Sequence, residues 1–127
     1  MYILDSYAWV EYFLASNKGE KVKELFSVEE NIFFTVECCL GELSSWCLRN
    51  KKDFNELFRV IRANSKILLV SQHNWIDVGK ERFQQRKTQK DFGLIDAVLL
   101  VKQKELNCKV VTGDKHFKDL NDVVFLE

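Results

Sequence analysis

The sequence contains no proline and only five glycines among its 127 residues. This composition excludes collagen-like segments and long proline-rich linkers, and the length favours one domain, which we place over residues 1–127. Long hydrophobic runs are also missing, because the longest uninterrupted one, Ala97 to Val101, is far too short to cross a membrane. We therefore expect no targeting segment, no membrane partner and a soluble cytoplasmic protein.

An excess of charge of either sign is absent as well. The 19 Lys and Arg residues balance the 19 Asp and Glu residues, which excludes a histone-like polycation but leaves room for a local nucleic-acid-binding patch. The four cysteines contain no C-x-x-C pair, so we expect buried, reduced thiols, with zinc and disulfides as minor alternatives. They are Cys38, Cys39, Cys47 and Cys108.

Short β-like segments alternate with longer helix-like segments along the whole chain. Such alternation indicates an α/β sandwich with a mainly parallel sheet. We expect Asp5, Thr35 and Asp53 to act as N-caps, and Asp91 to cap the helix over 94–106. The expected strands are 2–4, 31–35, 66–70, 109–112 and 123–126. The expected helices are 7–15, 21–26, 36–48, 54–63, 73–88 and 94–106, with a helical turn at 115–120.

Four carboxylates are notable for where they fall. Asp5 directly follows the first strand and Asp114 closely follows the strand over 109–112, so both should emerge at the same edge of a parallel sheet. Asp96 and Glu42 instead interrupt apolar helical stretches. A carboxylate in such a setting is costly unless it is paired, hydrogen-bonded or bound to a metal.

Each acid also has an ordinary structural interpretation. Asp5 and Asp114 could be simple N-caps, Asp96 could pair with a buried Lys or Arg, and Glu42 could face solvent. Taken together, however, four carboxylates without an adjacent nucleophile indicate a cation site, because a cluster of like charges is stable mainly around a cation. Oxygen ligands alone select Mg²⁺ or Mn²⁺ over zinc.

Four motifs follow one another along the chain. They are M-Y-I-L-D-S-Y-A-W-V-E-Y-F at 1–13, C-L-G-E-L at 39–43, F-G-L-I-D-A at 92–97 and V-V-T-G-D-K-H-F at 110–117. In these motifs the chain resembles PIN-domain proteins, and it is most similar to small single-domain toxins of the VapC type. Tyr7 departs from the family pattern, since it replaces the usual second hydroxyl residue. A fifth match is the closing strand at 120–126.

The resemblance implies a three-layer α/β sandwich with a five-stranded parallel sheet in the order 3-2-1-4-5. It also implies a metal-dependent ribonuclease with an RNA substrate, a homodimer and a small inhibitory antitoxin partner. The catalytic and Mg²⁺- or Mn²⁺-binding residues would be Asp5, Glu42, Asp96 and Asp114. Ser6 and Thr112 would assist them, with Asp119 as an outer contributor or a solvated surface residue. We favour Glu42 over Glu37, which lies about 140° away around the same helix.

Basic residues gather in one segment, where five cations and a single acid give a local charge of +4. They are Lys80, Arg82, Arg86, Lys87 and Lys90. Arg49, Lys51 and Lys52 form a second cluster. Both clusters fit either RNA contact or a solvated helix face. Of the two histidines, we expect His73 to pair with Asp77 on the surface, and His116 to be a packing or surface residue or to touch RNA.

Two other functions remain open from the sequence. The first is a catalytically idle PIN fold that serves as an RNA-processing or scaffold component, although the presence of all four acids counts against it. The second is a phospho-receiver domain, which should carry paired acids after its first strand. This chain has only Asp5 there, and the strands ending near Thr35 and Ser71 lack an acid.

Overall fold

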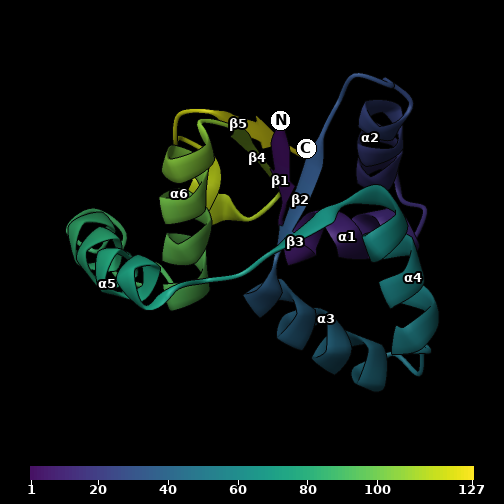
Figure 1. The fold of residues 1–127 in the computed structure, drawn as a ribbon, viewed down its shortest axis with the longest axis horizontal. Coiled ribbons are helices and arrows are strands. Elements are labelled where there is room, and N and C mark those ends of the chain that lie inside the picture. Colours follow the sequence, from purple (N-terminus) through teal and green to yellow (C-terminus); the bar gives the residue numbers. More distant parts are fainter.

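The computed structural model describes residues 1–127 as five strands, six α-helices and one 3₁₀ turn (Figure 1). All five strands pair in parallel, in the order β3-β2-β1-β4-β5. This confirms the predicted 3-2-1-4-5 sheet. It also differs from the 2-1-3-4-5 order of receiver-type doubly wound sheets, so the phospho-receiver alternative is wrong. The strands are β1 (Tyr2–Leu4), β2 (Phe33–Val36), β3 (Lys66–Leu68), β4 (Lys109–Thr112) and β5 (Val123–Phe125).

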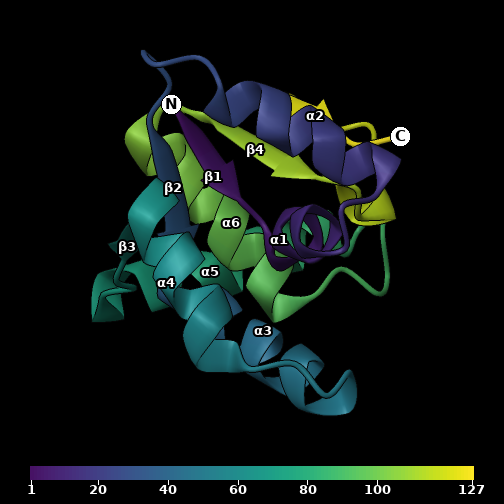
Figure 2. The ribbon, with the colours of Figure 1, turned by 90° about the vertical axis from the view of Figure 1, so that its right-hand side faces the viewer.

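The helices cover both faces of the sheet, with α5 and α6 on one side and the first four helices on the other (Figures 1 and 2). The alternation of side chains along each strand explains the two layers. Ile3 belongs to the core beneath α5 and α6, whereas its neighbour Leu4 belongs to the core beneath the other helices. The helices are α1 (Ser6–Phe13), α2 (Asn17–Phe26), α3 (Glu37–Arg49), α4 (Phe54–Asn64), α5 (Gln72–Gln85) and α6 (Leu94–Leu106), and the 3₁₀ turn η1 covers Lys115–Phe117.

The centre of the sheet positions the ends of two neighbouring strands. In the register of β1 and β4, Leu4 lies opposite Val111, and the backbone N–H of Asp5 donates to the carbonyl of Val111 at 3.1 Å. The next residues along both strands, Asp5 and Thr112, are therefore adjacent. The loops that follow them leave the sheet at its carboxyl edge, as the sequence predicted.

The element types agree with those predicted, and the differences lie at element ends. The helix predicted over 73–88 ends at Gln85, and the strand predicted over 66–70 ends at Leu68. Asp5 and Asp53 are N-caps as expected. The predicted cap at Thr35 is wrong, because Thr35 is fully buried in β2 and its hydroxyl bonds to Trp9 Nε1 and Ser65 Oγ instead.

All four cysteines are free thiols, of which Cys38 is half-buried and the other three are buried. No potential metal site in the chain brings two of them together, which disfavours the zinc alternative.

None of the six helices is long and apolar enough to cross a bilayer.

Candidate active site

The structure brings the four predicted carboxylates into one pocket of about 280 Å³. Asp5 comes from the end of β1, Glu42 from α3, Asp96 from the first turn of α6, and Asp114 from the segment after β4. Four segments that are far apart in the sequence thus meet at the carboxyl edge of the sheet. The pocket is completed by Ser6, Tyr7, Val10, Glu11, Leu43, Trp46, Arg49 and Ile95.

Asp5 is the most buried of the four acids, with only 5% of the residue exposed. Its Oδ1 accepts a hydrogen bond from the backbone N–H of Ser6 at 2.7 Å, and its Oδ2 accepts one from Thr112 Oγ1 at 2.7 Å. Burial raises the pKa of Asp5 from 3.8 to about 7, against the lowering effect of the Thr112 hydrogen bond. The nearby charges of Glu42 and Asp96 raise it further. Asp5 therefore caps a helix and also contributes a carboxylate to the pocket.

The hydroxyl of Ser6 connects Glu42 to Asp5. Ser6 Oγ donates to Glu42 Oε1 at 3.0 Å, which fixes the glutamate although the residue as a whole is exposed. Partial burial raises the pKa of the Glu42 carboxyl, and the charges of Asp96 and Asp114 add to this effect. Glu37 has a different role, because its Oε1 accepts the backbone N–H of Val70 at 2.7 Å.

Asp96 and Asp114 form the other half of the pocket. Asp96 Oδ2 accepts the backbone N–H of Gly93 at 2.9 Å, and burial raises its pKa against that hydrogen bond. Asp114 Oδ1 accepts the backbone N–H of His116 at 2.9 Å, while the N–H of Asp114 donates to Thr112 Oγ1 at 3.0 Å. The hydroxyl of Thr112 thus connects Asp5 to the segment that carries Asp114.

His116 lies beside these acids, a position that the sequence did not indicate. Its Nδ1 is 3.2 Å from Asp96 Oδ2 and 3.1 Å from Asp114 Oδ1. Its Nε2 is 3.1 Å from Asp91 Oδ1. The expectation that Asp91 caps α6 is wrong, because Gly93 occupies the N-cap position and Asp91 faces His116.

The negative charge of the pocket has no strong counter-ion in the protein. No lysine or arginine forms an ion pair with any of the four carboxylates, and His116 is the only ion-pair partner of Asp96 and Asp114. Two sets of donor atoms, each within 4.8 Å of one another, could hold an ion. One set is Asp5, Cys39 and Glu42, and the other is Asp96, Asp114 and His116. Such oxygen-rich, uncompensated sites fit a divalent cation.

The predicted basic segment is not part of the pocket lining. Arg86 Nε donates to the carbonyl of Phe92 at 2.8 Å, and Lys87 lies over the ring of Phe83, so both have structural contacts in α5 and the loop after it. Neither Lys80, Arg82 nor Lys90 lines the pocket. From the second basic cluster, Arg49 lines it.

Asp119 is exposed and does not line the pocket. It follows η1, where the N–H of Leu120 donates to the carbonyl of Phe117 and the chain turns toward β5. The structure therefore does not bring Asp119 to the other four acids.

Trp46 is a lining residue that the sequence analysis missed, and its helical spacing from Glu42 could have indicated it. Trp46 and Arg49 lie four and seven residues after Glu42 in α3, which places all three on one face of the helix. The ring of Tyr7 packs directly against Gly113, where a Cβ would collide with it. Gly113 thus allows the loop carrying Asp114 to pass close to α1.

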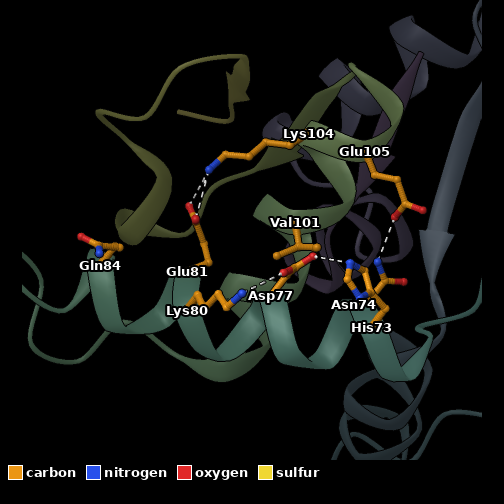
Figure 3. Close-up of a pocket in the computed structure, with 9 residues that line it drawn as sticks. All are labelled: His73, Asn74, Asp77, Lys80, Glu81, Gln84, Val101, Lys104 and Glu105. Carbon is orange, nitrogen blue, oxygen red and sulfur yellow. Dashed lines mark hydrogen bonds and ion pairs between the residues drawn. The ribbon is translucent and has the colours of Figure 1, made fainter.

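A larger pocket, of about 570 Å³, lies between α5 and α6 (Figure 3). Its charges are compensated within the protein. Lys104 pairs with Glu81 at 3.0 Å, and Asp77 pairs with His73 at 3.5 Å and with Lys80 at 3.9 Å. The expected surface pair of His73 and Asp77 is confirmed. Because its charges are balanced, this pocket lacks the electrostatic imbalance of the acidic one.

The fold and the site together define an all-parallel α/β sandwich with acids gathered at the carboxyl ends of its central strands. The PIN domain family model matches residues 2–123, and the chain therefore belongs to the PIN domain family. No curated protein sequence matches the chain.

Solved structures of toxin–antitoxin proteins share this fold. The chain is similar to VapC20 of Mycobacterium tuberculosis, described as a sarcin–ricin loop cleaving toxin, with a TM-score of 0.79 and 12% identity over 100% of both chains. It is similar to a toxin–antitoxin complex from Klebsiella pneumoniae (TM-score 0.74, 16% identity, 100% of this chain and 98% of that one). It is also similar to VapBC2 of Rickettsia felis bound to a promoter DNA fragment, with a TM-score of 0.73 and 16% identity over 98% of this chain and 96% of that one.

Proposed function

We propose that this PIN-domain protein is a metal-dependent endoribonuclease that hydrolyses RNA phosphodiester bonds with an activated water. The observation that carries the proposal is the meeting of Asp5, Glu42, Asp96 and Asp114 in one pocket, where none of them forms an ion pair with a lysine or arginine. Membership in the PIN family and the likeness to VapC structures support the same activity.

The four carboxylates would hold one or two Mg²⁺ or Mn²⁺ ions. The donor set fits such ions because it is dominated by oxygen and carries uncompensated negative charge. The chemistry supplied by a bound ion is the acidification of a water molecule and the neutralisation of charge on the scissile phosphate. In-line attack would leave a 5′-phosphate and a 3′-hydroxyl.

The protein's own residues keep the carboxylates in place before any ion binds. Thr112 and the backbone of Ser6 hold Asp5, the hydroxyl of Ser6 holds Glu42, and the backbone N–H of Gly93 holds Asp96. Such preorganisation means that little rearrangement is needed when charge develops in the transition state. Arg49 is an exposed residue that lines the pocket, and its guanidinium would contact an RNA phosphate.

The test is cleavage of single-stranded RNA by the purified protein with Mg²⁺, with Mn²⁺ and with a chelator. Activity should require the ion, return when it is added back, and fall by at least about a hundredfold in Asp5→Asn and Asp96→Asn. Cleavage that survives chelation, or that is normal in both variants, would refute the proposal. Metal binding without cleavage of any RNA would instead favour the catalytically idle scaffold.

We further propose that this enzyme is the toxin of a VapBC-type pair. In this role it would act in the cytoplasm as a homodimer, and a small antitoxin would block it. The support is the likeness to a toxin–antitoxin complex and to VapBC2. Light scattering of the purified protein tests the dimer. Relief of growth arrest by a small protein encoded beside it tests the antitoxin.

A further inference from the structure

We propose that His116 is a metal ligand through its Nδ1, together with Asp96 and Asp114, so that this half of the site takes a first-row transition ion such as Mn²⁺ in preference to Mg²⁺. The inference rests on the proposed function, because it concerns the same pocket. It adds a nitrogen donor to a site that otherwise offers oxygens, and thereby changes which ion the site prefers.

The positions of the three donor atoms fit one ion. Nδ1 of His116 is 3.2 Å from Asp96 Oδ2 and 3.1 Å from Asp114 Oδ1. Two ligands that bind one ion at about 2.1–2.2 Å and at right angles are separated by about 3.0–3.1 Å. Both distances from Nδ1 therefore match the spacing of neighbouring ligands in an octahedral site, and all three donor atoms lie within 4.8 Å of one another.

The imidazole ring is fixed but its nitrogens are not satisfied. The side chain is 14% exposed, and neither ring nitrogen makes a hydrogen bond of good geometry. The backbone N–H of His116 donates to Asp114, its carbonyl accepts from Gln89 Nε2 at 2.9 Å, and its ring packs edge-on against Phe92. Both nitrogens therefore lie beside carboxylates without a well-aligned hydrogen bond to any of them, and a buried polar group in this state requires an explanation. A ligand role for Nδ1 supplies one.

Asp91 completes the arrangement on the outer side of the ring. Its Oδ1 lies 3.1 Å from Nε2, the nitrogen that faces away from Asp96 and Asp114. Histidines that bind metals commonly present their second nitrogen to a carboxylate, which fixes the tautomer and the orientation of the ring. Asp91 would thus keep the proton on Nε2 and leave Nδ1 free to bind the ion.

The alternative is that His116 only pairs electrostatically with the two acids and leaves the ion to oxygen ligands. The two cases differ in whether a nitrogen of His116 is bonded to the ion, which pulsed EPR of bound Mn²⁺ measures directly. The chain has only two histidines. His73 lies on α5 in the other pocket, with its side chain 84% exposed, so His73→Gln leaves His116 as the sole histidine without touching the site.

The experiment uses full-length His73→Gln protein in which histidine alone carries ¹⁵N, loaded with Mn²⁺. In the labelled protein, we expect the electron spin echo of bound Mn²⁺ to be modulated by imidazole ¹⁵N. In unlabelled protein, we expect modulation by ¹⁴N in its place. We also expect a loss of Mn²⁺ affinity of at least about tenfold in His116→Gln, measured by calorimetry, with a smaller loss for Mg²⁺.

Two outcomes separate this inference from the proposed function. Mn²⁺ binding without histidine nitrogen modulation would overturn the ligand role of His116 and leave the nuclease proposal intact. Failure of the wild-type protein to bind either ion would overturn both. Because the labelling experiment leaves His116 unchanged, its result does not depend on whether His116→Gln folds.

Discussion

Thr112 holds Asp5 across 107 residues of sequence, since its Oγ1 donates a 2.7 Å hydrogen bond to Oδ2 of Asp5. The same hydroxyl accepts the backbone N–H of Asp114 at 3.0 Å. One buried side chain at the end of β4 therefore orients two of the four acids. It does so because β1 and β4 are neighbours in the sheet, with Leu4 opposite Val111.

Replacing this hydroxyl should weaken both the fold and the site. Thr112→Val keeps the shape of the side chain but removes the donor to Asp5 and the acceptor for Asp114. We expect the free energy of unfolding to fall by about 1–3 kcal/mol, because polar groups are left unpaired in a buried position. Thr112→Ser keeps the hydroxyl and is the matched control. Urea denaturation of both variants measures the difference, and equal stabilities would contradict the role of the hydroxyl.

The stability of the metal-free protein should fall as the pH rises from about 4 to about 7. Burial raises the pKa of Asp5 from 3.8 to about 7, so the folded state holds a proton that the unfolded state has released over this range. Each such group lowers the free energy of unfolding by up to about 1.4 kcal/mol per pH unit. Glu42 and Asp96 have raised pKa values and act in the same direction.

The measurement is urea unfolding in chelator at several pH values between 4 and 8. The free energy of unfolding of Asp5→Asn should decline less steeply with pH than that of wild type, because the buried carboxyl of Asp5 no longer titrates. Asp119→Asn, which alters an exposed acid outside the pocket, should follow the wild-type curve. A decline in Asp5→Asn as steep as that of wild type would show that Asp5 is not its source.

The two glutamates of α3 should separate folding from metal binding. Glu37→Ala removes the acceptor for the backbone N–H of Val70 and should cost about 1 kcal/mol of stability while metal affinity is unchanged. Glu42→Gln should weaken Mg²⁺ or Mn²⁺ binding at least about tenfold without loss of stability in the metal-free state. Calorimetry and urea denaturation on the same samples give both quantities. The reverse pattern would exchange the roles assigned to the two residues.

Arg49 should contact RNA and Lys80 should not. Arg49 lines the acidic pocket, whereas Lys80 lines the other pocket and lies 3.9 Å from Asp77. In an Asp96→Asn background that prevents cleavage, we expect Arg49→Gln to reduce RNA affinity. The slope of log affinity against log salt should fall by about 0.7, the value for one lost phosphate contact on a single strand. Fluorescence anisotropy measures both. An equal effect of Lys80→Gln would mean that RNA also occupies α5.

The sequence predicted the parallel strands and the meeting of the acids at their ends because these features depend on local signals. Asp5 and Asp114 follow strands directly, and parallel strands end at one edge, so their meeting follows from strand direction. Asp96 was recognisable as a charge in an apolar helix. The sheet order itself came from the resemblance to the PIN family, since no local pattern fixes which strand lies beside which.

The parts that could not be predicted depend on contacts between distant segments. Threonine is a common N-cap residue, but in the folded core the hydroxyl of Thr35 forms hydrogen bonds with Trp9 and Ser65 instead. His116 turns toward Asp96 only because a single 3₁₀ turn follows Asp114, and Asp91 reaches it from the loop before α6. Such contacts carry no periodic or compositional signal.

The most direct test is the single-turnover rate of RNA cleavage with saturating Mn²⁺ by wild type, Asp96→Asn and Asp119→Asn, purified identically. We predict that Asp119→Asn retains the wild-type rate, that Asp96→Asn loses at least about a hundredfold, and that chelator abolishes the activity of the first two. Cleavage by Asp96→Asn at the wild-type rate, or cleavage that is insensitive to chelator, would contradict a metal-dependent nuclease built on these carboxylates.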